Sequence, residues 1–183
     1  MKLVTFKDQG NTRIGVLQIQ DGRETIVDLK VADPQLPTEM IEFLKGGAEV
    51  LQMAKKAITD ASPEAILDRS AVMLKAPIPC PGKIICLGLN YRDHAEESNQ
   101  PLPEYPIVFS KYANTVIGPG EAIVLPKVTD QVDYEAEFGV VIGRPARQSG
   151  NPFCARMRSD WFPNSSGSKI TRRCSPSLNT TRR

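Results

Sequence analysis

The chain has 183 residues, of which 24% are charged and 40% are hydrophobic, so it can bury the core of one domain or slightly more. No apolar run approaches the ~20 residues that span a bilayer, and the start of the chain lacks the apolar segment of a signal peptide, which argues against a membrane protein. We therefore expect a cytoplasmic protein, or a mitochondrial one if a targeting extension is absent from this version of the chain. The four cysteines match no paired zinc-ligand spacing, which favours buried or idle thiols in a reducing compartment.

Charge is distributed unevenly along the chain. Residues 1–143 hold 14 Lys and Arg against 20 Asp and Glu, a net charge of −6, whereas residues 144–183 hold 9 against 1, a net charge of +8. This contrast indicates that two different kinds of sequence are joined near Gly143.

The first 76 residues contain strand and helix signals in turn. Alternating apolar residues predict strands over residues 3–6, 14–19 and 25–29, with Asp21-Gly22 as the turn between the last two. Apolar residues at helical spacing predict a helix over residues 38–45, capped by Thr38 and ended by Gly46-Gly47, and a second over residues 48–59. A further turn or two of helix is expected over residues 62–68.

A run of three prolines, Pro77, Pro79 and Pro81, holds the chain extended and is interpreted as a domain boundary. Beyond it, a continuous apolar run over residues 83–90 predicts a buried central strand. Further strands are expected over residues 107–111, 122–126 and 134–142, the second preceded by the turn signal Gly118-Pro119-Gly120. After Gly143 the periodicity stops, and disorder is the default expectation for the basic tail, residues 147–183.

Two carboxylates stand at the head of the last predicted strand. On a strand, Glu135 and Glu137 share one face with Asp133, about 6–7 Å apart, and repel by roughly 2–3 kcal/mol at an effective dielectric of 20. A divalent cation would remove this repulsion, and oxygen ligands suit Mg²⁺, Mn²⁺ or Ca²⁺ better than zinc. The alternative is an amphipathic strand whose acidic face meets water.

A second group of candidates contains the single histidine of the sequence. His94 and Glu97 are three residues apart, so one helical turn after Asn90 would bring them to one face, where the glutamate could orient the imidazole as a base. Asp93 could cap that turn or reach a metal. Lys111, at the end of a strand, could bind a substrate carboxylate or stabilise an enolate. The alternatives are a solvated surface turn and a solvated lysine.

Together these motifs resemble one protein family. The residues from Lys83 to Glu97, then Phe109-Ser110-Lys111, then Asp133 to Gly143, are similar to the fumarylacetoacetate hydrolase family. The resemblance implies an α+β protein: a mainly β catalytic domain of rolled mixed sheets, begun here by residues 77–146, preceded by a small α+β N-terminal domain, residues 1–76. It also implies a homodimer that binds Mg²⁺ or a similar cation and acts on short 1,3-dicarbonyl or 2-oxo acids.

The resemblance further implies roles for five residues. Glu135 and Glu137 match metal ligands, His94 and Glu97 match a water-activating pair, and Lys111 matches a substrate lysine. Such a site would chelate the 2-oxo and carboxylate oxygens of the substrate on the metal and split a C–C bond, as in acylpyruvate hydrolysis or oxaloacetate decarboxylation. Keto–enol isomerisation is also among the family's reactions.

The chain departs from the family after residue 146. The segments that usually supply a third acidic ligand and the late strands are absent, and the setting of Asp160 does not match them. We therefore predict a truncated or frame-altered product with little or no turnover. The competing hypothesis is a non-catalytic remnant or a binding module whose basic tail, with Arg172-Arg173 and Arg182-Arg183, binds nucleic acid or acidic partners. Any binding of nucleic acid is expected to be weak, without specificity and salt-dependent.

Overall fold

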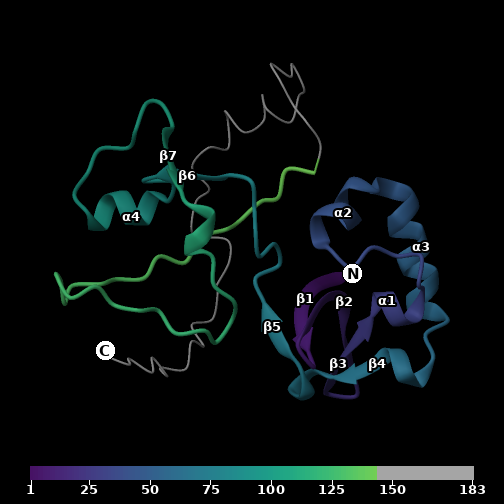
Figure 1. Cartoon of the computed structure of the whole chain (residues 1–183). Coiled ribbons are helices and arrows are strands. Elements are labelled where there is room, and N and C mark those ends of the chain that lie inside the picture. Colours follow the sequence, from purple (N-terminus) through teal and green to yellow (C-terminus); the bar gives the residue numbers. More distant parts are fainter. Residues whose placement is uncertain (144–183) are drawn as a thin grey trace. The chain divides into compact units, whose positions relative to one another are not determined.

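The structure is a computed structural model that describes residues 1–143, and these residues form two compact units (Figure 1). The first unit contains Met1–Pro81, Asn114–Ile123 and residues 134–143. The second contains Gly82–Ala113 and Val124–Asp133. The predicted tail features, including Asp160 and the paired arginines, lie outside the described residues, and the three predicted domain ranges stay a prediction.

An antiparallel five-stranded sheet is the centre of the first unit. Its strands are β1 (Lys2–Asp8), β2 (Asn11–Gln20), β3 (Arg23–Asp28), β4 (Ile66–Asp68) and β5 (Met73–Lys75), in the order β4-β3-β2-β1-β5. The predicted hairpin turn is confirmed: Asp21 and Gly22 have φ values of 51° and 78°, the left-handed backbone that a two-residue turn between twisted strands requires. The first three strands therefore pair through adjacent sequence.

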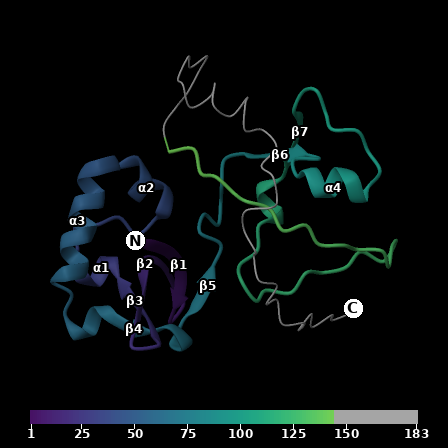
Figure 2. The same cartoon turned by 180° about the vertical axis from the view of Figure 1, so that it is seen from behind.

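Three helices lie along one side of this sheet, as Figures 1 and 2 show from opposite directions. They are α1 (Leu29–Ala32), α2 (Met40–Lys45) and α3 (Gly47–Thr59), so both predicted helices are confirmed. The predicted cap of α2 is wrong: Glu39 holds the N-cap position with no side-chain hydrogen bond, because the helix begins two residues after Thr38. Asp28 caps α1 by accepting hydrogen bonds from the amides of Lys30 and Val31, which explains why Leu29 lies in a helix rather than in the predicted strand.

The core of the first unit has two clusters of buried side chains. The cluster under the helices consists of Ile14, Val16, Leu29, Leu36, Met40, Phe43, Ala54 and Ala57. The other consists of Phe6, Ile26 and Val72. Because side chains alternate along a strand, β2 contributes to the first cluster and β1 and β3 contribute Phe6 and Ile26 to the second. The predicted helical turn over residues 62–68 is half right, since a 3₁₀ turn over Pro63–Ala65 leads straight into β4.

A two-stranded antiparallel sheet and one helix form the ordered part of the second unit. Strand β6 (Ile84–Gly88) pairs with β7 (Ile107–Lys111), and helix α4 (Arg92–Glu97) lies between them in sequence. The predicted strands are confirmed, but the expectation of a buried central strand is wrong. Within residues 1–143, β6 has one sheet neighbour, and the Ile85 side chain is 68% exposed.

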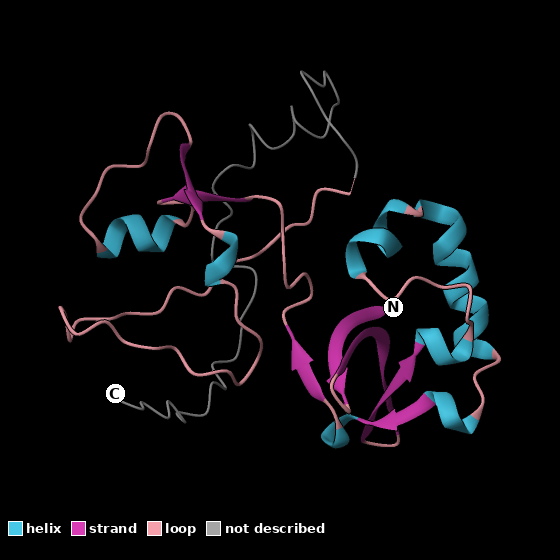
Figure 3. Cartoon of the chain, in the orientation of Figure 1, coloured by secondary structure: helices cyan, strands magenta, loops and turns pink. Residues whose placement is uncertain are grey.

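The strands predicted over residues 122–126 and 134–142 are absent, and Figure 3 draws this stretch as loop. A strand requires a hydrogen-bonding neighbour, and no described strand pairs with either segment. Their apolar side chains are therefore exposed, Phe138 to 83% and Val124 to 82%. Every strand pair in the described chain is antiparallel. None of the helices within residues 1–143 has the length and apolar character needed to cross a membrane.

Candidate functional site

Helix α4 carries the predicted His94–Glu97 pair, and the predicted helical turn after Asn90 is confirmed. The chain enters it through Leu89, whose positive φ of 49° turns the backbone at the end of β6. The Ala95 side chain is buried and anchors this helix by packing, whereas the side chains of His94 and Glu97 are exposed. Although the two residues share one short helix, no hydrogen bond joins their side chains in this structure.

Asp93 does not cap α4, contrary to one of its two predicted roles. Tyr91 occupies the N-cap position, and an oxygen of Asp93 accepts a hydrogen bond from the amide of His94 at 3.0 Å. The helix ends where the amide of Ser98 donates to the carbonyl oxygen of His94 at 3.0 Å. Asp93 therefore stabilises the first turn from within the helix.

Lys111 is the last residue of β7, and its side chain is exposed. The strand register pairs Lys111 with Ile84 and pairs Ile107 with Gly88, the end of β6 from which the chain leads to α4. Lys111 lies four residues along β7 from Ile107, so the two ends of the hairpin are about 13 Å apart. The hairpin thus places the backbone of Lys111 away from the end where α4 begins. Its ammonium lies 6.0 Å from the centre of the Phe109 ring, within the range of a cation–π contact.

Glu135 and Glu137 lie in the loop over residues 134–143 of the first unit, and both side chains are exposed. No group of three or more His, Cys, Asp or Glu side chains gathers as a candidate cation site anywhere in residues 1–143. Ca²⁺ takes six to eight oxygen ligands, several of them from the protein, whereas Mg²⁺ keeps several waters and is usually bound through one or two carboxylates together with groups of the substrate. The described residues therefore do not make the set of protein ligands that Ca²⁺ takes.

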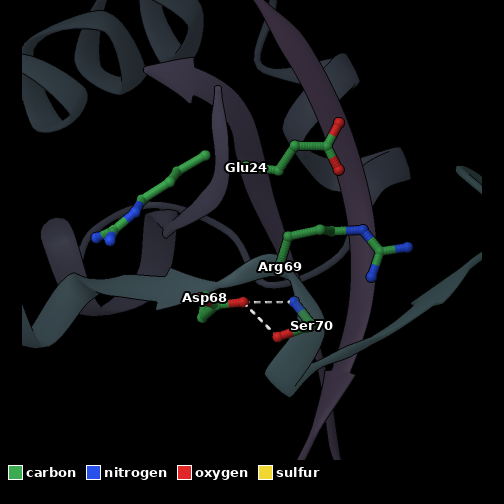
Figure 4. Close-up of a pocket in the computed structure, with 5 residues that line it drawn as sticks. Glu24, Asp68, Arg69 and Ser70 are labelled. Atoms are coloured by element: carbon green, nitrogen blue, oxygen red, sulfur yellow. Dashed lines mark hydrogen bonds between the residues drawn. The ribbon is translucent and has the colours of Figure 1, made fainter. Parts of the chain in front are cut away.

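An open depression on the first unit contains none of the predicted site residues. Arg23, Glu24, Asp68, Arg69 and Ser70 line it, and Figure 4 shows Asp68 joined to Ser70. Asp68 accepts hydrogen bonds from the hydroxyl of Ser70 at 2.5 Å and from its amide at 2.8 Å, which lowers the pKa of Asp68. Asp68 thereby caps the 3₁₀ turn over Arg69–Ala71, so these contacts have a local structural role.

A second feature that the sequence did not indicate is a contact between β5 and the loop at Gly118. The turn predicted at Gly118-Pro119-Gly120 is confirmed: the amide of Glu121 donates to the carbonyl oxygen of Gly118 at 3.1 Å. One carboxylate oxygen of Glu121 accepts a hydrogen bond from the amide of Gly118 at 2.6 Å, and the other forms an ion pair with Lys75. The Gly118 hydrogen bond and then the Lys75 ion pair lower the pKa of Glu121. We call Lys75, Gly118 and Glu121 the β5 clamp.

Gly118 packs directly on the backbone of β5. A Cβ atom at this position would lie 3.0 Å from the Cα atom of Lys75 and 3.1 Å from the carbonyl oxygen of Leu74. Any larger residue would therefore push the loop away from the strand. No sequence signal could reveal this contact, because 46 residues separate Lys75 from Glu121.

Several proteins are similar to this chain in sequence. The oxaloacetate tautomerase fahd2 of Xenopus laevis, named as mitochondrial, is 46% identical over 149 residues, which are 80% of this chain and 46% of the relative. Human oxaloacetate tautomerase FAHD2A, also named as mitochondrial, is 41% identical over 122 residues, covering 67% of this chain and 38% of the relative. The chain spans about half, or less, of the length of these relatives.

Solved structures show the same fold. An HpcE protein from Mycobacterium smegmatis matches with a TM-score of 0.51 and 26% identity over 67% of this chain and 40% of that one. Maleylpyruvate hydrolase from Sphingobium sp. SYK-6 matches with a TM-score of 0.50 and 27% identity over 69% of this chain and 43% of that one. Another crystal structure of that hydrolase, which matches at 24% identity, contains manganese(II) and pyruvate. These matches confirm the α+β fold class.

One family model matches this chain, over residues 83–156, and it describes the C-terminal part of fumarylacetoacetate hydrolase. All five predicted site residues lie within that range. The resemblance found in the motifs is thus confirmed: residues 83–156 carry part of the C-terminal domain of the fumarylacetoacetate hydrolase family.

Proposed function

We propose that this chain supplies the proton-transfer part of a site that acts on a short 2-oxo acid, with keto–enol tautomerisation of oxaloacetate as the reaction. The relatives named oxaloacetate tautomerase favour this reaction over the C–C cleavage that the motifs first suggested. Since the chain spans only part of those relatives, the activity belongs to the proposal.

The observation that carries the proposal is the exposure of His94 and Glu97 on one short helix whose opposite side is held by buried Ala95. An imidazole side chain can both accept and return a proton, which is why histidine serves as a general acid and base. Residues three apart on a helix lie on the same face, so Glu97 can approach the imidazole by a change of rotamer. This arrangement suits general acid–base catalysis.

In the proposed reaction, His94 removes a proton from the carbon next to the 2-oxo group. The electron pair of that C–H bond forms the C=C bond, and the electron pair of the carbonyl moves to oxygen. The imidazolium then protonates that oxygen to give the enol, so the substrate is isomerised without a net change in atoms or electrons. Glu97 stabilises the imidazolium by its negative charge. Lys111 stays a predicted stabiliser of the enolate charge.

We further propose that Glu135 and Glu137 contribute two oxygen ligands to a divalent cation, Mg²⁺ or else Mn²⁺ or Ca²⁺. The manganese ion in the maleylpyruvate hydrolase structure supports a divalent cation in this fold. Because two carboxylates are an incomplete ligand set, we expect weak binding by this chain and slow turnover. We also propose that the protein forms a homodimer. We propose a mitochondrial rather than a cytoplasmic location, because the similar tautomerases are named as mitochondrial.

The test is the decay of enol oxaloacetate in the presence of the purified chain, followed by ultraviolet absorbance with Mg²⁺ and with a chelator. We expect a rate above that of buffer, and a fall of about a hundredfold or down to the buffer rate in His94→Ala, since general acid–base catalysis contributes at least that factor. Glu97→Gln should lower the rate, whereas Glu96→Gln, which removes the same charge from the same helix, should not. Equal rates for the unaltered chain and His94→Ala would refute the proposal.

Cation binding has its own readout, because a bound Mn²⁺ ion broadens the NMR signals of nearby nuclei. If Mn²⁺ binds at Glu135 and Glu137, titration with Mn²⁺ should broaden the amide signal of Ala136, which lies between them in the sequence. The double variant Glu135→Gln/Glu137→Gln should abolish the broadening. Unchanged broadening in that variant would remove both glutamates from the proposed site.

A second candidate reaction is hydrolysis of a C–C bond in an acylpyruvate. The match to maleylpyruvate hydrolase at 27% identity favours it. In this case the same pair takes its proton from water, which attacks the carbonyl distant from the 2-oxo group. Release of pyruvate from an acylpyruvate, measured with lactate dehydrogenase and NADH, separates hydrolysis from tautomerisation, which releases no product.

A further inference from the structure

Residues 82–113, which carry His94, Glu97 and Lys111, are connected to the first unit at both ends. At the entrance, the hydroxyl of Thr5 on β1 donates a hydrogen bond to the carbonyl oxygen of Pro77 at 2.7 Å. At the exit, the β5 clamp holds Gly118 against the backbone of Leu74 and Lys75. The chain therefore leaves and rejoins the first unit beside the same short strand.

The exit contact is built from two interactions of Glu121 that act together. Glu121 uses one carboxylate oxygen to close its own turn through the Gly118 amide, and the other to bind Lys75. The side chains of Lys75 and Glu121 are only 27% and 32% exposed, whereas those of the surface pair Lys45 and Glu42 are 67% and 58% exposed. A charge pair that is shielded from water is weakened less by solvent and salt than an exposed one.

We propose that Lys75 and Glu121 are positioning residues that fix the exit of the segment 82–113 to β5. Their effect on the reaction rests on the proposed function, since they act through the segment that carries His94, Glu97 and Lys111. Without the ion pair, Glu121 no longer links the Gly118 turn to Lys75, and the loop over residues 114–123 separates from the strand more easily. The segment is then held less firmly at its exit.

The test is amide hydrogen exchange, followed by mass spectrometry, in peptides that cover residues 114–123 of the full chain. Loss of a half-shielded, hydrogen-bonded charge pair should speed exchange there by about three- to tenfold. We expect this increase in Lys75→Met and in Glu121→Gln, and a larger one in Glu121→Ala, which also removes the acceptor for the Gly118 amide. Lys45→Met and Glu42→Gln are matched controls that remove an exposed pair and should leave this segment unchanged.

Two further variants distinguish positioning by charge from a general loss of packing. Lys75→Arg keeps the ion pair and should keep the protection. The exchanged pair Lys75→Glu/Glu121→Lys should recover the part of the protection that the ion pair provides, but not the part that depends on the Gly118 hydrogen bond, because a lysine at 121 cannot accept it. Exchange across β1, β2 and β3 should stay unchanged in every variant, which verifies that the first unit is folded.

Unchanged exchange in residues 114–123 of Lys75→Met and Glu121→Gln would overturn the inference, and so would an equal loss of protection in Lys75→Arg. The proposed function is tested separately by enol decay in the unaltered chain. If that chain has no activity while the clamp variants show faster exchange, the proposed function fails and the fixed exit stands. If activity is present and Lys75→Met lowers it, Lys75→Arg should restore it.

Discussion

Residues 1–81 and residues 82–143 are both rich in apolar side chains, yet they bury them very differently. In the first region, Ile14 and Leu36 are fully buried in the cluster under the helices, and Phe6 and Ile26 are fully buried in the second cluster. In the second, every residue of β7 is exposed, as are Tyr134 to 80% and Phe138 to 83%. Apolar sequence alone thus does not determine a core; it requires neighbours that supply the opposite surface.

The difference follows from where the neighbours lie in the sequence. Strands β1, β2 and β3 are joined by two-residue turns, so each finds its partner within about ten residues, and closing such short loops costs little entropy. Strand β6 pairs with β7 across an intervening helix, and no partner within residues 1–143 pairs with the segments over 122–126 and 134–142. The second region therefore buries few apolar side chains, because its strands need partners that are distant in the sequence.

The largest expected effect comes from removing one aromatic ring from each region. Phe6→Ala should lower the free energy of unfolding by about 3–5 kcal/mol, because it leaves a cavity in a fully buried cluster. Phe138→Ala should change it by less than about 0.5 kcal/mol, as expected for an exposed side chain. Urea denaturation of both variants measures this, and similar losses in the two would break the comparison.

A smaller effect is expected from adding one methyl group to a glycine in each of two settings. Gly15→Ala should destabilise by about 1–3 kcal/mol, because overpacking forces neighbours apart. Its Cβ would lie 2.6 Å from Cγ2 of Ile26 and 2.7 Å from the carbonyl oxygen of Val27. Gly139→Ala is the control, since a Cβ there meets nothing within 4 Å. Thermal unfolding of both variants gives the measurement, and a tolerated Gly15→Ala would show that β2 and β3 separate easily.

The smallest expected effect is the weakening of the β5 clamp in acid, which we compare with strands β1 to β3 of the same unit. The Gly118 hydrogen bond and the Lys75 ion pair lower the pKa of Glu121 from its usual 4.5. Its contribution to stability is therefore complete above pH 4.5 and is lost as the pH falls through the lower folded-state pKa. Protection factors in residues 114–123, which correct the exchange rates for their intrinsic slowing in acid, should fall in this acid range, and Glu121→Gln should abolish this fall while β1 to β3 stay protected. An identical pH profile in Glu121→Gln would assign the effect to other carboxylates.

The sequence predicted those features that depend on nearby residues. Asp21-Gly22 identified the hairpin, the apolar spacing over residues 48–59 identified α3, and the spacing of His94 and Glu97 anticipated α4. Prediction failed where a distant partner decides the outcome. The alternation from Tyr134 to Ile142 predicts a strand with two faces, but it carries no information about a neighbouring strand, and this stretch is a loop. In the same way, nothing local to Lys75 or Glu121 reveals that they meet.

Because the chain returns to β5, the first unit is separable from the residues between Ala76 and Gly118. Because a Cβ on Gly118 would lie only 3.3 Å from the amide nitrogen of Ala76, the residues between these two points enter and leave at nearly one place. Residues 77–117 are therefore an insertion at one position of the first unit, and they do not connect two distant parts of it. Excision of this insertion and a short glycine joint would leave the strand order of the five-stranded sheet unchanged, so other polypeptides with adjacent termini can be grafted at this position.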